Sequence, residues 1–233
     1  MYNISFFDLI WIFVPLIVVY YIYYKWSDDT TSIPYALSRM IIQLIALGYF
    51  LTYIFETKNF FIIILILSTM LIVASIISLR PVTNKSKSLY LSSFISITIG
   101  GLITLIFVIG GVLDISLWFE PRFLIPIAGM IFANSMNSVS IAAERFESEY
   151  QKTTNLIKAR NIAYKSSLIP NINTLFAVGL VAIPGMMTGQ ILSGVDPMIA
   201  VNYQIMVMCM VILSGGISSA IYLKITSKNN KDR

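Results

Sequence analysis

Apolar runs of about twenty residues alternate with short polar connections along almost the whole chain. A run of that length lets an α-helix cross the hydrocarbon core of a membrane, which is about 30 Å thick. The pattern predicts an all-α, polytopic membrane protein with seven transmembrane helices, at residues 4–25, 36–56, 59–79, 89–113, 123–145, 168–193 and 199–224.

The composition supports this class and excludes several others. Hydrophobic residues make up 57% of the chain and charged residues 12%, whereas soluble domains contain about 25% charged residues. The chain has no histidine and one cysteine, Cys209, which excludes imidazole-based catalysis, histidine-ligated haem or zinc, and an intramolecular disulfide. We therefore expect a single transmembrane domain over residues 1–233, with no catalytic residues and no cofactor.

The lysines and arginines give the expected orientation. If the N-terminus lies outside, all 16 of them except Lys58 and Arg122 lie on the inner side, as the positive-inside rule requires. The sequence thus predicts an N-out, C-in protein of the cell membrane (plasma or inner membrane). This topology also accounts for the net charge of +5, so we expect contacts with membrane lipid and none with nucleic acid.

The longest polar stretch, residues 146–167, follows the fifth apolar run and would form a cytoplasmic loop. It can form an amphipathic helix with apolar residues near one face. Two interpretations stay open: a solvated connector on the bilayer surface, or a docking element for a cytoplasmic partner. In the second, the candidate docking residues are Glu149, Lys158 and Arg160.

The sixth predicted helix is weakened in its middle by the sequence P-G-M-M-T-G-Q. Proline removes a backbone donor, and freed polar groups at membrane depth are tolerated only against protein or a water-filled cavity. The sequence predicts a broken-helix segment of functional importance at Pro184, Gly185, Met186, Met187 and Gly189. Two simpler interpretations compete, since G-x-x-x-G is typical of close helix packing and methionine fills apolar cores as readily as it ligates soft metals.

Polar residues at membrane depth are few, and each is a candidate for a transport pathway. Asn134 and Asn137 share one face of the fifth helix, although asparagines also join helices by hydrogen bonds. Asn171 and Asn173 follow Pro170, where helix capping explains them. The candidate pathway-lining residues are Gln43, Asn134, Asn137, Thr188 and Gln190. The pattern assigns no metal ligands.

Four collinear stretches carry a resemblance to a known family. The run LIPNINTLFAVGLVAIPGMMTGQILSGVDPMIAVNYQIMVM (168–208) closely resembles the FetB (YbbM-like) family of ABC-transporter permeases. SRMIIQLIALGYFLTYIF (38–55), SSFISITIGGLITL (92–105) and IPIAGMIFANSM (125–136) match in the same order. The order P-G-M-M-[ST]-G, then G-[IV]-D-P, then Y-Q-I-M is the specific part of the signature.

The resemblance implies a transmembrane permease domain that dimerises and pairs with a separate ATP-binding cassette subunit, which alone would hydrolyse ATP. The bacterial family is associated with iron export, and plant relatives with aluminium tolerance, so a metal cation is the implied substrate and a sugar nucleotide the alternative. The stretch 153–165 contains neither the glutamate nor the glycine of the family's longer docking loop. A second hypothesis is therefore a non-transporting membrane scaffold or regulatory subunit.

Overall fold

The structure, a computed structural model, describes residues 5, 7–27, 29–56, 59–113 and 120–231. Within these ranges the chain forms helices and turns, with one isolated bridge between Val178 and Ala182. The predicted all-α fold of a polytopic membrane protein is confirmed.

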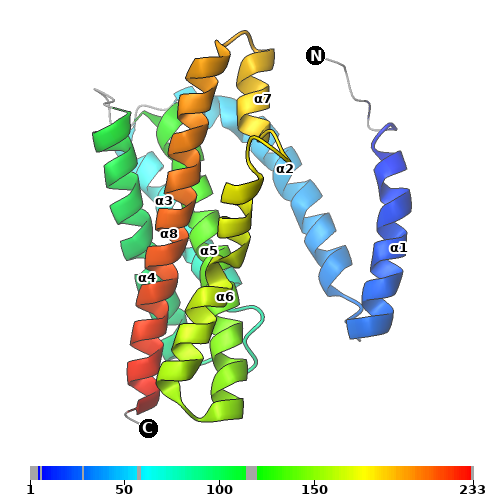
Figure 1. Ribbon diagram of the computed structural model, residues 1–233. Coiled ribbons are helices and arrows are strands. Elements are labelled where there is room, and N and C mark those ends of the chain that lie inside the picture. Colours follow the sequence, from blue (N-terminus) through cyan, green and yellow to red (C-terminus); the bar gives the residue numbers. More distant parts are fainter. Residues whose placement is uncertain (1–4, 6, 28, 57–58, 114–119, 232–233) are drawn as a thin grey trace. The chain divides into compact units, whose positions relative to one another are not determined.

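Six of the described helices are long and apolar enough to cross a membrane (Figure 1): α1 Ile10–Ser27, α2 Ser32–Glu56, α3 Phe60–Ser78, α4 Lys87–Ile106 with its π-helical continuation η1 Phe107–Val112, α5 Pro121–Thr153 and α8 Pro197–Lys231. Two further helices, α6 Leu156–Ala177 and α7 Gly185–Leu192, occupy the region of the sixth predicted helix. The number of spans and the orientation stay predictions.

The described residues separate into two compact units. The single transmembrane domain stays a prediction. In the first, Met1–Glu56, the carboxylate of Asp29 organises the connection between α1 and α2. Its oxygens accept the backbone N–H groups of Thr31 and Ser32, each at 3.0 Å, and the Tyr23 hydroxyl at 3.1 Å. Hydrogen bonds from the Ser32 side chain and from the backbones of Thr31 and Ser32 hold the pKa of Asp29 well below its ordinary value. No described side chain of α1 is buried, so its apolar surface is available to lipid.

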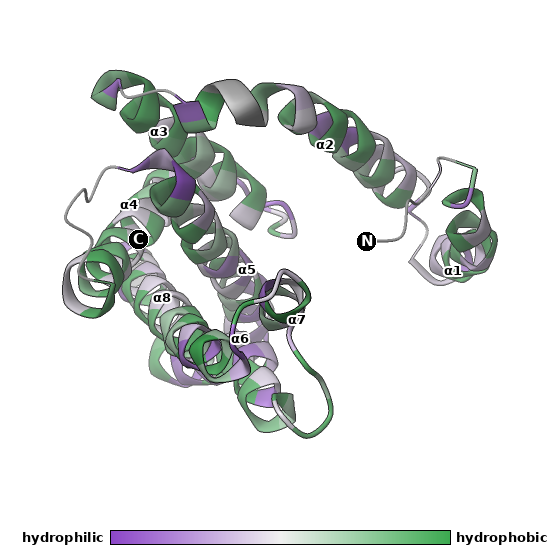
Figure 2. Cartoon of the chain, turned by 90° about the horizontal axis from the view of Figure 1, so that it is seen from above, coloured by the Kyte–Doolittle hydropathy of each residue, from purple (hydrophilic) through white to green (hydrophobic). Residues whose placement is uncertain are grey.

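In the second unit, Thr57–Arg233, α5 is the central helix and contacts α3, α4, α6 and α8. Figure 2 shows these helices from above as one bundle. Ile97, Ile131 and Val139 are fully buried at its centre. Serines fill much of the remaining interior, as is typical where helices associate within lipid by close packing rather than by exclusion of water.

Two glycines allow α8 to approach its neighbours closely. A Cβ added to Gly100 of α4 would lie 2.9 Å from the backbone nitrogen of Ser218 on α8. A Cβ added to Gly215 of α8 would lie 2.7 Å from Asn171 Nδ2 on α6 and 2.9 Å from Asn134 Nδ2 on α5. All three distances are below any ordinary carbon contact. At Gly100 the backbone of α8 would have to move, whereas at Gly215 the two asparagine side chains would have to shift.

The sixth predicted helix, 168–193, is interrupted earlier than the sequence predicts. α6 ends at Ala177, whose carbonyl accepts the N–H of Val181 at 2.8 Å, and Gly179 adopts φ +85°, a conformation open mainly to glycine. The five residues of the predicted broken segment instead begin α7, with Pro184 as its N-cap residue. A proline disfavours helix in the residue before it and suits a helix start after it, which is why the break lies on its N-terminal side.

The predicted cytoplasmic loop, 146–167, is almost entirely helical. α5 continues to Thr153, and α6 begins at Leu156. Between them Thr154 adopts the left-handed conformation with φ 51°, and the Asn155 side chain caps α6 by accepting the N–H of Lys158 at 3.0 Å. The predicted loop therefore consists of the end of α5, a tight turn and the start of α6. The turn is short because Asn155 caps α6 directly after Thr154.

Candidate functional site

A layer of hydrogen bonds between polar side chains joins α5 to α8 inside the bundle. Asn134 Nδ2 donates to the Val211 carbonyl and, at 3.1 Å, to the hydroxyl of Ser214. One turn on, the hydroxyl of Ser218 donates to that of Ser135 at 3.0 Å. Asn134 thus takes the helix-joining role that the sequence left open, although it still lies at the centre of the most polar part of the bundle.

α6 joins this polar layer through Asn171, which sequence reasoning misplaced. Asn171 is 9% exposed in the body of α6 and donates to the hydroxyl of Ser138 on α5 at 3.3 Å. The prediction that it caps a helix after Pro170 is wrong, because the helix starts at Leu156 and includes that proline. Asn137, the other predicted member of the α5 face, is exposed.

The α7–α8 hairpin carries a second polar feature. Gln190 on α7 is half-buried and Gln204 on α8 is 5% exposed. The amide oxygen of each is buried without a hydrogen-bond partner in the part of the chain that the structure describes. A buried polar atom left unpaired costs free energy, so these two oxygens mark a place where water or a polar ligand would be stabilised. Sequence reasoning missed Gln204, although it is a polar residue in an otherwise apolar run and belongs to the Y-Q-I-M part of the signature.

The remaining predicted pathway residues, Thr188 and Gln43, are both exposed. Thr188 is exposed on α7 and donates its hydroxyl to the Pro184 carbonyl at 3.1 Å. Gln43 is exposed on α2, in the other compact unit. Met206 and Met210 of α8 belong to the hydrophobic core, so packing is their role.

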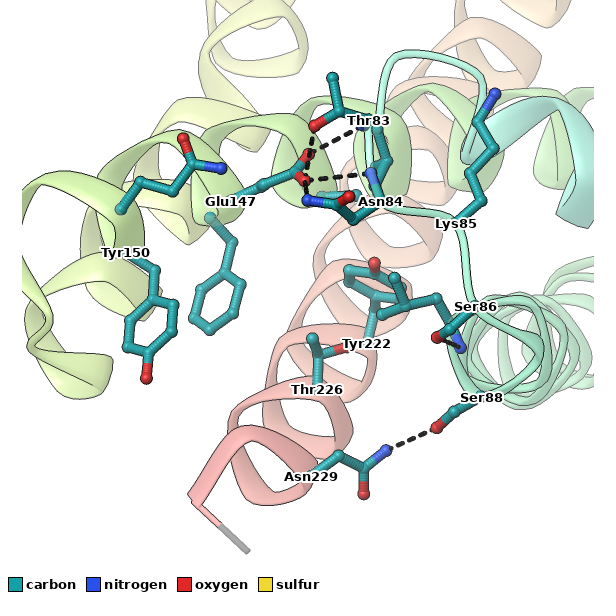
Figure 3. A pocket seen from close by; sticks show the side chains of 15 residues that line it. Thr83, Asn84, Lys85, Ser86, Ser88, Glu147, Tyr150, Tyr222, Thr226 and Asn229 are labelled. Carbon is teal, nitrogen blue, oxygen red and sulfur yellow. Dashed lines mark hydrogen bonds between the residues drawn. The ribbon is translucent and has the colours of Figure 1, made fainter. Parts of the chain in front are cut away.

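A cavity of about 600 Å³ lies between the connection from α3 to α4 and the ends of α5 and α8 (Figure 3). Glu147 of α5 closes it on one side by binding that connection. Its carboxylate accepts the backbone N–H of Thr83 at 3.0 Å, the Thr83 hydroxyl at 2.7 Å and the backbone N–H of Asn84 at 3.3 Å. Sequence reasoning missed Glu147, because nothing in the spacing pairs it with residues more than sixty positions earlier.

The predicted docking residues differ in accessibility. Glu149 is 8% exposed and forms ion pairs with Arg145 at 3.1 Å and Lys152 at 3.8 Å, and its role in docking stays a prediction. The ion pairs are local: the two cations stand one turn away on either side of it, where helical side chains meet. Lys158 is exposed and Arg160 half-buried.

The polar atoms available to a substrate inside the bundle are amide, hydroxyl and carbonyl oxygens. Within the described residues, no three histidine, cysteine, aspartate or glutamate side chains gather where they could hold a metal ion. The layer around Asn134 and Asn171 offers amide, hydroxyl and carbonyl groups instead.

Comparison with known proteins gives consistent results. A family model described as UPF0014, an uncharacterised protein family, matches residues 6–230. A UPF0014 membrane protein of Synechocystis sp. is 35% identical over 82% of this chain and 79% of its own length. The probable iron export permease protein FetB of Escherichia coli K12 is 35% identical over 84% of this chain and 80% of its own length. The Arabidopsis thaliana protein ALUMINUM SENSITIVE 3 is 30% identical over 79% of this chain and 72% of its own length. No solved structure matches.

Proposed function

The chain belongs to the UPF0014 family of membrane proteins, and from this premise we propose that it is the membrane-spanning permease subunit of an ABC-type exporter. It moves iron or another metal cation outward, with ATP hydrolysed by a separate ATP-binding cassette subunit, and works as a homodimer with its N-terminus outside. The observation that carries the proposal is the 35% identity, across 80% of the relative's length, to a protein named as a probable iron export permease.

Two structural features support a pathway through the second unit. The layer around Asn134 and Asn171 places neutral polar groups inside a bundle otherwise filled with apolar side chains. The unpaired amide oxygens of Gln190 and Gln204 provide further polar groups nearer the N-terminal end of α8. Amide and carbonyl oxygens are suitable ligands for a partly hydrated divalent cation.

The test is ATP-dependent loading of Fe²⁺ into inside-out vesicles that contain the permease and its ATP-binding subunit. The double variant Asn134→Ala/Gln190→Ala should load at least about tenfold more slowly than wild type, the effect of roughly 1.4 kcal/mol on the rate-limiting barrier. The control is Asn173→Ala/Asn202→Ala, which removes two exposed amides from α6 and α8. Wild-type loading by the first variant, with or without an effect of the control, would rule out this pathway.

A second candidate function follows from the connection between α5 and α6. The turn at Thr154 and Asn155 leaves no separate docking helix there, which favours a non-transporting scaffold or regulatory subunit. Mixing the purified protein with an ATP-binding cassette subunit separates the two: co-purification and stimulated ATP hydrolysis support the permease, and their absence supports the scaffold. A labelled sugar nucleotide in the same vesicles tests the alternative substrate.

A further inference from the structure

Two adjoining cavities run along the line where α6 meets α8, at the end of the bundle that holds the turn between α5 and α6. Their volumes are about 670 and 270 Å³, and Arg160 lines both. Figure 1 shows the two helices side by side there, with the C-terminal part of α8 in red. We define the basic groove by the residues that carry its chemistry: Thr154, Arg160, Tyr164, Lys224, Ser227 and Lys228.

The basic groove is cationic and contains no acidic residue among those that line it. Glu149 on α5 forms ion pairs with Arg145 and Lys152 and not with the cations of the groove. One N–H of the Arg160 guanidinium donates to the side-chain oxygen of Asn161 at 3.4 Å. Its remaining donors and the exposed ammonium groups of Lys224 and Lys228 are therefore available to an anion.

The lengths of the uncharged runs place the groove at the edge of the membrane. Residues 123–143 of α5 carry no charge and span about 32 Å, and residues 197–223 of α8 span about 40 Å, at 1.5 Å per residue. The hydrocarbon core is about 30 Å thick. Lys224, the first charge of α8 after its uncharged run, thus stands at headgroup level, and Lys228 lies one turn further out.

The groove also changes character along its length. Its end nearest the membrane is formed by Tyr164, Ala220 and Leu223, and its outer end by hydroxyl and cationic groups that include Ser227 and Lys228. A phospholipid has this same order, with acyl chains below a phosphate. Tyrosine is a frequent residue at the boundary between hydrocarbon and headgroups.

We propose that the basic groove binds the phosphate headgroup of an anionic phospholipid, whose acyl chains descend past Tyr164 and Ala220. Arg160 donates N–H groups to the phosphate from α6, and Lys224 and Lys228 add charge from α8. The bound lipid bridges α6 and α8 below the break at Val178–Pro184. This inference does not depend on which substrate, if any, the protein transports.

The experiment measures retention of dioleoyl phosphatidylglycerol by native mass spectrometry, after reconstitution of the full chain in mixed phosphatidylglycerol and phosphatidylcholine and extraction in mild detergent. The variant Arg160→Gln/Lys224→Gln should bind phosphatidylglycerol about tenfold more weakly than wild type, because two interfacial cations are lost. The matched control, Lys158→Gln/Lys165→Gln, removes two exposed cations of α6 that do not line the groove and should bind as wild type does.

Three further results decide the inference. Arg160→Lys with Lys224 intact should recover most of the binding, which shows that charge and not a folding defect is measured. Equal retention by both double variants would overturn the proposal, as would displacement of the lipid by millimolar inorganic phosphate, because that would indicate a site for free phosphate. Unchanged lipid retention together with loss of a co-purifying ATP-binding subunit would also overturn it, and would assign the groove to protein docking.

Discussion

The glycines where α8 contacts α4, α5 and α6 lie in tight packing, whereas the glycines of the short helix α7 lie in open space. At Gly100 and Gly215 an added Cβ would meet backbone and amide atoms of neighbouring helices at less than 3 Å. At Gly185 and Gly189, although they form a G-x-x-x-G pattern, an added Cβ would meet nothing within 4 Å. The pattern alone therefore does not reveal packing, and the open surface of α7 is left for lipid, a partner or movement.

The sharpest test of this difference in packing is a glycine-to-alanine substitution at the contact of α4 with α8 and another in α7. Gly100→Ala should lower the free energy of unfolding by about 3 kcal/mol, because the backbone of Ser218 must move to admit the new carbon. Gly189→Ala should leave it unchanged or raise it by up to about 1 kcal/mol through helix propensity. Denaturation of the purified protein in detergent, followed by helical circular dichroism, measures both, and equal destabilisation would remove the contrast.

The break between α6 and α7 should respond to substitution at one glycine only. Gly179→Ala should destabilise residues 178–184 by about 1–2 kcal/mol, because alanine is strained at φ +85°. Gly185→Ala should not destabilise this segment, because Gly185 lies in the first turn of α7. Hydrogen exchange of the amides in this segment checks the prediction, which fails if the two variants exchange alike.

Asn134 and Asn137 of α5 test how much the hydrogen bonds between α5 and α8 contribute to stability. Asn134→Ala should cost about 1 kcal/mol, since Ser214 and the Val211 carbonyl lose a donor. Asn137→Ala, on an exposed position of the same helix, should cost close to nothing. The comparison uses the same denaturation assay, and a larger effect at Asn137 would show that its surface is covered by something else.

The smallest expected effect has the opposite sign. Gln204→Met removes a buried amide oxygen without a described partner and should stabilise the protein by up to about 1 kcal/mol. If this oxygen serves the proposed pathway, Fe²⁺ loading should fall in the same variant. Destabilisation would show instead that Gln204 is already paired in the membrane.

The sequence predicted features that depend on one local signal, such as the long apolar helices. It did not predict features that depend on contacts between distant residues. Apolar length located the long helices, and proline with glycine indicated a break in the sixth. Pro184 accounts for a break on its N-terminal side, but the exact end of α6 at Ala177 coincides with a turn at Gly179, whose left-handed conformation has no signature in the sequence. Asn171 hydrogen-bonds to Ser138 on another helix, and Glu147 binds Thr83 in the connection between α3 and α4. No periodicity in the sequence identifies such distant partners.

The π-helical stretch at the end of α4, Phe107–Val112, bears on how this chain can vary in length. A π-turn contains one residue more than an α-turn, so the C-terminal end of α4 contains one extra residue within its helix. Deleting Gly111, where an added Cβ would meet nothing within 4 Å, would let the segment rewind as an α-helix while Lys87–Ile106 keeps its register. Insertions and deletions of one residue should accordingly be tolerated here, and not in the α-helical part of α4 that carries Gly100.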